Sequence, residues 1–125
     1  MKILVVDDSR IMRTIVKNSL LKDKNNEYEF KEASNGVDAF NILEREPVDI
    51  VLLDWNMPHL NGLDLTKELR SLPKYQKLPI IMLTSEAAKY NVIEAVKAGV
   101  NDYMIKPVNE NVLIEKIEQI FSKEK

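Results

Sequence analysis

The chain has 125 residues, of which 45% are hydrophobic, and a formal net charge of −2 at pH 7. This length suits one compact domain, and a charge so near zero excludes bulk attraction to nucleic acid or to an acidic membrane. Cysteine is absent, which excludes disulfides, thiolate metal sites and cysteine nucleophiles. No apolar run is long enough for a secretory signal or a membrane span, so a soluble cytoplasmic protein is expected.

Strand and helix patterns alternate in the first half of the chain. Residues 3–6 predict a buried strand, and Ser9 is placed to cap the helix that follows. Residues 28–33 alternate in the manner of an edge strand. A second helix then begins at residues 34–36, and residues 49–53 predict a third strand.

The same alternation continues in the second half. Gly62 opens a helix, residues 74–78 follow it as an expected surface loop, and residues 79–83 predict a fourth strand. Gly99 suits the position just after the end of a fourth helix. The apolar residues of that fourth helix are Val92, Ile93 and Val96. A fifth strand at residues 103–105 and a last helix capped by Asn109 complete the chain.

Five such strand–helix repeats predict a three-layer α/β fold. Each connection is long enough for a right-handed crossover, and short apolar strands favour a parallel sheet with helices on both faces. In an open parallel sheet, ligands bind beyond the carboxyl ends of the strands. The functional site is therefore expected at that edge.

Polar or charged residues stand at the ends of four of the five predicted strands. They are Asp7 and Asp8 after the first, Asp54 after the third, Thr84 after the fourth and Lys106 after the fifth. Helix capping alone favours Ser, Thr or Asn and does not account for a lysine. Two carboxylates ~5 Å apart repel by about 3 kcal/mol at an effective dielectric constant of ~20, and a divalent cation would offset this repulsion. An all-oxygen donor set favours Mg²⁺ over Zn²⁺ or Cu²⁺.

Few nucleophiles are available near these strand ends. His59 is the single histidine of the chain and is expected to be an exposed loop residue, so no serine can be assigned a histidine base. A carboxylate can itself attack phosphorus and form an aspartyl phosphate. Asp54 is the best candidate for this role. Mg²⁺ and Lys106 would neutralise the phosphoryl oxygens in the transition state, and the Thr84 hydroxyl could donate to the attached group.

Over its whole length, this arrangement resembles response-regulator receiver domains. The run at residues 54–58, the Asn61-Gly62 pair and Tyr103 are similar in particular to the CheY family of chemotaxis regulators. The resemblance implies one receiver domain over residues 1–125. It also implies a flavodoxin-like (βα)5 sandwich with a five-stranded parallel sheet in the order 2-1-3-4-5. Val108 departs from the aromatic residue that CheY proteins often carry after the Lys-Pro pair.

The resemblance further implies a role for each site residue. Asp8 and Asp54 would bind Mg²⁺ directly, together with the backbone carbonyl of Asn56, and Asp7 would act through water. A histidine kinase would supply the phosphoryl group to Asp54. Asn56 and Glu86 would set the rate of dephosphorylation by placing or blocking water.

A switch and an output surface are also implied by the family. Thr84 and Tyr103 would form the switch pair, with Thr84 moving toward the phosphate and Tyr103 turning inward, and Lys106-Pro107 would be a cis bond. The output surface would be formed by the fourth helix, fifth strand and fifth helix, including Ala87, Lys89, Tyr90, Tyr103 and Lys116.

The implied protein is a signalling switch whose only catalysis is its own phosphorylation and dephosphorylation, and not an enzyme acting on other substrates. An aspartyl-phosphate phosphatase would need an acid–base Asp two residues after the nucleophile, where Asn56 stands. A flavin or dinucleotide carrier would need a Gly-rich or hydroxyl-rich loop where Asp7-Asp8 would repel phosphate.

One alternative shares the same chemistry and stays open: a receiver belonging to a longer regulator with a DNA-binding or second-messenger output. The expected partners are a histidine kinase and a downstream effector such as the flagellar motor switch. No direct contact with nucleic acid or membrane is expected, and the protein is expected to be a monomer.

Overall fold

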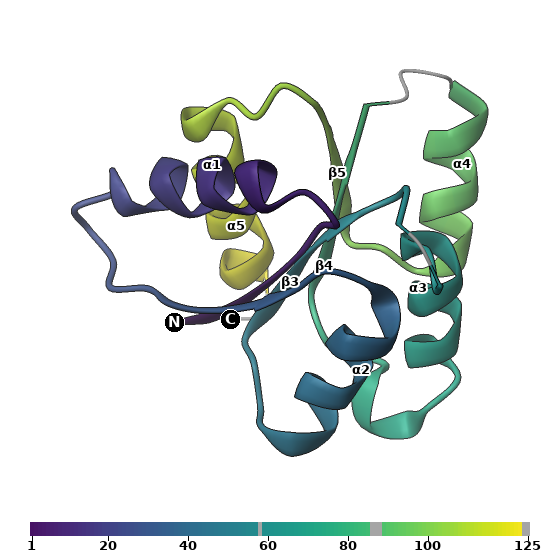
Figure 1. Ribbon diagram of the computed structural model, residues 1–125. Coiled ribbons are helices and arrows are strands. Elements are labelled where there is room, and N and C mark those ends of the chain that lie inside the picture. The colour runs from purple at the N-terminus through teal and green to yellow at the C-terminus, as the bar shows by residue number, and fades with distance from the viewer. Residues whose placement is uncertain (58, 86–88, 124–125) are drawn as a thin grey trace.

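Five parallel strands form one sheet in the order β2-β1-β3-β4-β5 (Figure 1). The computed structural model describes residues 1–57, 59–85 and 89–123, and of residues 89–91 and 123 it describes the backbone alone. The flavodoxin-like order implied by the resemblance to receiver domains is thereby confirmed. The strands are β1 (Lys2–Val6), β2 (Glu29–Ala33), β3 (Ile50–Asp54), β4 (Ile80–Thr84) and β5 (Asp102–Ile105).

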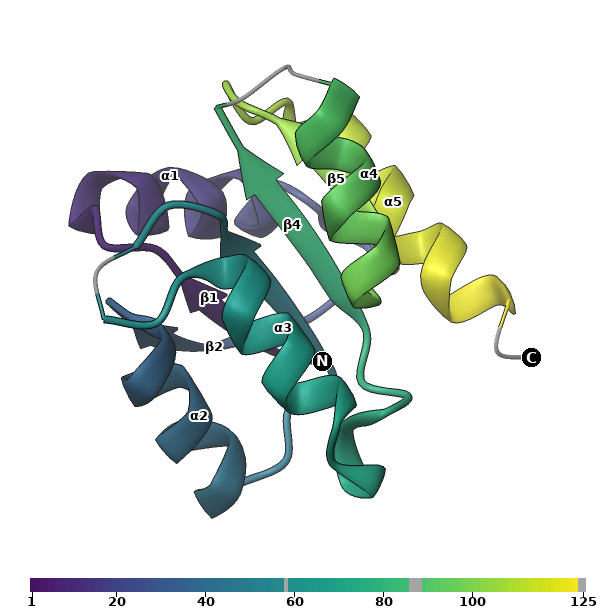
Figure 2. The ribbon, with the colours of Figure 1, turned by 90° about the vertical axis from the view of Figure 1, so that its right-hand side faces the viewer.

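Helices cover both faces of the sheet and complete the three layers. In Figure 2, α2, α3 and α4 lie in front of the strands, and α1 and α5 lie behind them. None of the described helices has the length and apolar character that a bilayer crossing needs. The helices are α1 (Arg10–Leu21), α2 (Gly36–Arg45), α3 (Gly62–Arg70), α4 (Lys89–Ala98) and α5 (Glu110–Lys123), with a short 3₁₀ helix at Pro73–Tyr75.

The core is divided by the sheet into two apolar layers, because alternate strand residues point to opposite faces. Ile3 and Val5 of β1 pack in the layer that contains Val16 of α1 and Leu113 of α5. Leu4 lies in the other layer, with side chains of α2, α3 and α4. All five residues of β3 and of β4 are buried, as expected for the central strands of a parallel sheet.

Side-chain caps fix the helix starts near the carboxyl ends of the strands. The Ser9 hydroxyl accepts a hydrogen bond from the Met12 amide, and the Asn109 side chain accepts one from the Val112 amide. Both caps were predicted from the sequence. Gly99 has φ +112°, a conformation that glycine adopts readily, and it follows the last residue of α4 as expected.

Two features differ from the sequence-based expectation. Within the expected surface loop 74–78, Tyr75 belongs to the 3₁₀ helix and is buried, and its hydroxyl donates to Glu44 over 2.6 Å. On α4, Ile93 and Val96 are exposed, and Ala95 is the buried side chain among residues 92–98, whose side chains the structure describes. Apolar residues at helical spacing therefore predicted the helix but not which of them the fold covers.

Arg70, at the end of α3, joins three segments near the amino ends of the strands. Its guanidinium donates to the backbone oxygens of Gly99, Tyr75 and Leu78 and to the side chain of Asn101. Burial lowers the pKa of Arg70 from its ordinary value. The end of α3 is thus tied directly to the residue that follows α4.

Candidate functional site

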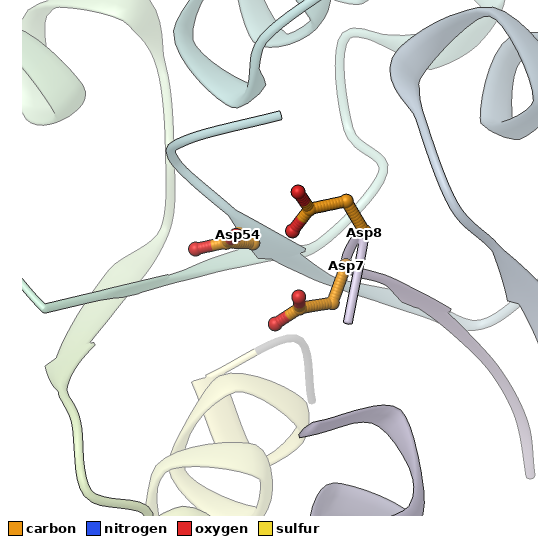
Figure 3. A group of neighbouring side chains, drawn as sticks. All are labelled: Asp7, Asp8 and Asp54. Atoms are coloured by element: carbon orange, nitrogen blue, oxygen red, sulfur yellow. The ribbon is translucent and has the colours of Figure 1, made fainter. Parts of the chain in front are cut away.

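Strand register brings three carboxylates together at the carboxyl edge of the sheet. Val6 pairs with Leu53 across β1 and β3, so the residues that follow β1 lie beside Asp54 at the end of β3. One oxygen from each of Asp7, Asp8 and Asp54 lies within 4.8 Å of the others (Figure 3). The grouping expected from the strand ends is therefore present in the structure.

Asp7 is held at several atoms and is 3% exposed. Its amide donates to the Ala33 carbonyl of β2, which continues the strand pairing by one residue. One carboxylate oxygen accepts the Ser9 amide over 2.9 Å, and the other accepts the ammonium of Lys106 over 3.1 Å. Asp8, in contrast, is exposed. The first strand thus supplies one fixed carboxylate and one that faces solvent.

Lys106 joins β5 to the acidic cluster. Its Nζ atom lies 3.1 Å from Asp54 Oδ1 and 3.1 Å from Asp7 Oδ2. Its backbone amide donates to the Thr84 carbonyl over 2.8 Å, which aligns the ends of β4 and β5. The Lys106–Pro107 peptide bond is cis.

Burial and neighbouring charges both act on the pKa values of Asp54 and Lys106. Burial, with the nearby charge of Asp7, raises the pKa of Asp54 above its ordinary value of 3.8, although Lys106 counteracts the shift. For Lys106, burial alone would lower the pKa. The charges and hydrogen bonds of Asp54 and Asp7 outweigh that effect and raise the pKa of Lys106. Asp54 is therefore more basic than an exposed aspartate, and Lys106 is cationic at neutral pH.

The donor set fits a hard divalent cation. It consists of three carboxylates, and their combined charge exceeds that of Lys106. Carboxylate oxygens with free access to solvent on one side suit Mg²⁺, which keeps several of its water ligands when bound to protein. Asp8 is on that solvent side. Asn56, whose backbone carbonyl is the further expected ligand, lies in the loop after β3 and is exposed.

The end of β4 and the loop after β3 hold three further residues considered in the sequence. Thr84 is buried at the end of β4, where its strand pairs with β3 on one side and with β5 on the other. Trp55 is half-buried and packs against the core layer of α2, α3 and α4. His59 is exposed, as predicted, and has φ 70°.

Tyr103 and Lys116, both expected on the output surface, lie next to each other. Lys116 Nζ is 5.7 Å from the centre of the Tyr103 ring, within the range of a cation–π contact. The same ammonium forms an ion pair with Asp102 over 3.0 Å. Both Tyr103 and Lys116 are partly exposed, and Lys116 thus connects α5 to the start of β5.

Four expected residues lie partly or wholly outside the described part of the chain. Glu86 and Ala87 are outside it. Lys89 and Tyr90 are in the first turn of α4, and their side chains are outside it.

Arg13 is a site residue that the sequence patterns did not indicate. From α1 it donates to the backbone carbonyl of Asp7 over 2.7 Å and pairs with Glu32 of β2 over 3.0 Å. A contact between a long side chain and a backbone carbonyl leaves no compositional pattern. The spacing of six residues between Asp7 and Arg13 would have been a signal only once the helix between them was placed.

A family model for the response regulator receiver domain matches residues 3–118. The chain belongs to this family. Its members share the acidic grouping at the sheet edge that the geometry shows, and Mg²⁺ is the ion they generally bind there. Relatives in sequence and a solved structure show the same similarity to CheY proteins that the motifs indicated.

Two curated relatives are chemotaxis proteins. A CheY homolog of Campylobacter jejuni is 48% identical over 121 residues, which cover 96% of this receiver and 92% of the relative. CheY1 of Helicobacter pylori is 46% identical over 121 residues, which cover 96% of each chain. The solved structure of the chemotaxis response regulator CheY4 of Vibrio cholerae aligns with a TM-score of 0.84 at 29% identity, covering 95% of this receiver and 97% of that chain. This receiver is therefore similar to CheY proteins in both sequence and fold.

Proposed function

We propose that this receiver accepts a phosphoryl group from a histidine kinase on Asp54 and passes the resulting change to a downstream protein. The observation that carries the proposal is the bridge from Lys106 Nζ to Asp54 and Asp7 beside a third carboxylate. It unites a basic carboxylate, a fixed cation and an oxygen donor set at one edge of the sheet. Phosphoryl transfer needs this combination because it depends on positioning and charge stabilisation.

In the transfer step, an Asp54 carboxylate oxygen attacks the phosphorus of a phosphohistidine. The new O–P bond forms as the P–N bond breaks, and the electron pair of the P–N bond goes to the imidazole nitrogen of the kinase. The raised pKa of Asp54 makes its ionised oxygen a better nucleophile than an exposed aspartate. Because Asp54 is 5% exposed, competing water has limited access to the attacking oxygen.

Lys106 holds Asp54 in place before transfer and has a further N–H to offer afterwards. An ammonium group has three donors, and two are directed at Asp54 and Asp7. The third can donate to a phosphoryl oxygen. Asp8 and Asp54, with the Asn56 carbonyl, would hold Mg²⁺, which supplies charge neutralisation when bound. Asp7 would contribute through water, and the Thr84 hydroxyl would donate to the attached phosphoryl group.

The output would pass through α4, β5 and α5. Thr84 and Tyr103 would act as the switch pair, and Asn56 and Glu86 would set the rate of dephosphorylation. The surface presented to the effector would include Ala87, Lys89, Tyr90, Tyr103 and Lys116. The CheY relatives favour a chemotaxis output such as the flagellar motor switch, in the cytoplasm, over a DNA-binding or second-messenger output.

Incubation with acetyl phosphate and Mg²⁺, followed by intact-mass measurement, tests the phosphoacceptor. The wild-type protein is expected to gain one phosphoryl group, and Asp54→Asn is expected to gain none. A phosphoryl group on a carboxylate of the Asp54→Asn variant would assign the acceptor to another residue. For the partner, a purified chemotaxis histidine kinase is expected to transfer labelled phosphate to the wild type alone.

A further inference from the structure

Arg13 contacts the peptide group between the two aspartates that follow β1. Its Nη1 donates to the Asp7 carbonyl oxygen over 2.7 Å, and its Nε donates to Glu32 Oε1 over 3.0 Å. The Arg13 side chain is 15% exposed, and its guanidinium is planar, so these two bonds fix the orientation of the guanidinium. Lys17, one turn further along α1, binds the other oxygen of the same Glu32 carboxylate over 2.8 Å.

The carbonyl oxygen of Asp7 and the amide nitrogen of Asp8 belong to one planar peptide unit. A hydrogen bond to that oxygen therefore fixes the plane of the Asp7–Asp8 peptide, and with it the orientation of the Asp8 Cα from which the side chain extends. Asp7 has other anchors, because its amide and both carboxylate oxygens have partners. The Asp8 carboxylate is exposed and has no hydrogen bond to a described residue. Two described contacts act on the direction of Asp8: the Ser9 amide, which donates to the Asp7 carboxylate and closes a turn around Asp8, and Arg13, which holds the Asp7 carbonyl.

We infer that Arg13 is a positioning residue for Asp8, setting the affinity of the acidic cluster for Mg²⁺ by fixing the Asp7–Asp8 peptide. This inference rests on the proposed function. A residue that orients a metal ligand without touching the metal typically changes the affinity by 10-fold to 100-fold when it is mutated. Arg13 lies in that position relative to Asp8.

The alternative is that Arg13 only ties α1 to Glu32 of β2. Lysine separates the two roles, because one ammonium keeps the charge and can keep the ion pair but lacks the rigid fork of donors. Arg13→Lys is therefore expected to retain the fold and the local charge while releasing the Asp7 carbonyl. A purely structural role would leave its Mg²⁺ affinity unchanged.

If Arg13 acted only through its charge, replacing it with a neutral residue would raise the affinity for Mg²⁺, whereas loss of positioning lowers it. Removing a positive charge near a cation site strengthens cation binding, since like charges repel. Positioning predicts weaker binding when Arg13 is replaced. Lys17→Met is the matched control, because it removes one positive charge from the same Glu32 carboxylate and leaves the Arg13–Asp7 contact in place.

The test is a titration of the folded protein with Mg²⁺. Binding is measured by calorimetry and by the fluorescence emission of Trp55, the single tryptophan. The dissociation constant is expected to rise about 10-fold in Arg13→Lys. In Lys17→Met it is expected to stay the same or fall. In the metal-free proteins, the ¹⁵N chemical shift of Asp8 is expected to move in Arg13→Lys and to stay unchanged in Lys17→Met.

Equal Mg²⁺ affinity in wild type and Arg13→Lys would overturn the inference but leave the proposed function standing. A loss of Mg²⁺ affinity in Lys17→Met as large as that in Arg13→Lys would do the same. Wild-type protein that binds no Mg²⁺ would overturn the proposed function together with the inference. Arg13→Met serves as the second variant. It removes the charge, so weaker Mg²⁺ binding in it can arise only from lost positioning, and tighter binding would count against the role assigned to Arg13.

Discussion

A Cβ atom at Gly62 would lie 2.3 Å from the backbone carbonyl oxygen of Asp54. This close approach lets the first residue of α3 pack against the end of β3, and the Gly62 amide donates to the Trp55 carbonyl over 3.0 Å. The start of α3 therefore sets the position of the Asp54 backbone.

Gly62→Ala is expected to displace Asp54 and to destabilise the fold by about 1–3 kcal/mol, since overpacking a buried contact forces the backbone to shift. Thermal unfolding measures the loss, and Mg²⁺ affinity is expected to fall as well. Gly36→Ala is the control, because its Cβ would lie 2.3 Å from the Leu60 carbonyl instead. A similar loss of stability with an undisturbed Mg²⁺ affinity is expected there. Unchanged Mg²⁺ affinity in Gly62→Ala would contradict the prediction.

Asp54→Asn is expected to stabilise the metal-free protein. The raised pKa of Asp54 shows that burial and Asp7 oppose its charge more than Lys106 supports it. Neutralising it should raise the free energy of unfolding by about 1 kcal/mol, or roughly 3–5 °C in melting temperature. Calorimetry in EDTA checks this, with the exposed Glu118→Gln as a control. A lower melting temperature for Asp54→Asn would mean that local hydrogen bonds outweigh the repulsion.

Mg²⁺ is expected to reverse that order by favouring the wild type. At tenfold over its dissociation constant, a ligand that binds only the folded state contributes about 1.4 kcal/mol. The variant lacks one of the expected carboxylate ligands and should gain less. The measurement is the change in melting temperature between EDTA and Mg²⁺ for each protein, and an equal gain in both would argue against Asp54 as a ligand.

The stability difference between Asp54→Asn and the wild type should depend on pH. Because the pKa of Asp54 is higher in the folded state than its ordinary value of 3.8, the folded protein binds a proton that the unfolded chain has released. The contribution of this group to the free energy of unfolding is fully present below pH 3.8. It is lost as the pH rises through the pKa that Asp54 has in the folded state. The advantage of Asp54→Asn in EDTA should grow over that window. A constant difference across it would rule out the raised pKa.

The strand ends predicted the acidic cluster well because a parallel sheet leaves little freedom there. Once residues 3–6 and 49–53 were assigned to neighbouring parallel strands, Asp7 and Asp54 had to meet at the same edge. Lys106 followed by the same reasoning. The apolar runs indicate the strands and their common direction, whereas the strand order that makes residues 3–6 and 49–53 neighbours came from the resemblance to receiver domains.

The features that the sequence did not predict depend on tertiary placement. Arg13 reaches the Asp7 carbonyl only because α1 packs at a particular distance from β2. Tyr75 is buried because the 3₁₀ helix turns it toward Phe40 of α2, 6.3 Å between ring centres. Exposure of Ile93 on α4 depends on which neighbours cover that helix. Periodicity does not contain such distances.

Lys106→Ala is expected to accept phosphate but to respond weakly at Tyr103. Lys106 directly follows β5, and its ammonium contacts Asp54, while its backbone amide donates to the Thr84 carbonyl of β4. Tyr103 lies three residues earlier, on β5. Without the ammonium, the charge added at Asp54 loses its direct contact with β5. NMR of the beryllofluoride-treated protein measures the response, with the exposed Lys67→Ala of α3 as a control. A Tyr103 shift as large as in wild type would exclude this coupling.

His59→Gly is expected to stabilise the protein slightly. His59 has φ 70°, where a side chain costs roughly 1–2 kcal/mol and glycine does not. The greater freedom of glycine in the unfolded chain offsets about 0.5–1 kcal/mol of that gain. Urea unfolding should therefore show an increase of about 0.5 kcal/mol. His59→Ala, which keeps a Cβ, should show no increase, and a gain equal to that of glycine would point to a cause other than φ.

The Arg70 guanidinium gives α4 one fixed end. It binds the carbonyl of Gly99, directly after the last turn of that helix, and it is anchored in turn by the backbone oxygens of Tyr75 and Leu78. With that end held, α4 is a lever about 15 Å long whose pivot is at Gly99. A rotation of roughly 10° would carry the Lys89 end by about 2–3 Å while the amino-terminal edge of the sheet stays still. A rotation of this helix about Gly99 would therefore be largest on the side where Asp54 lies.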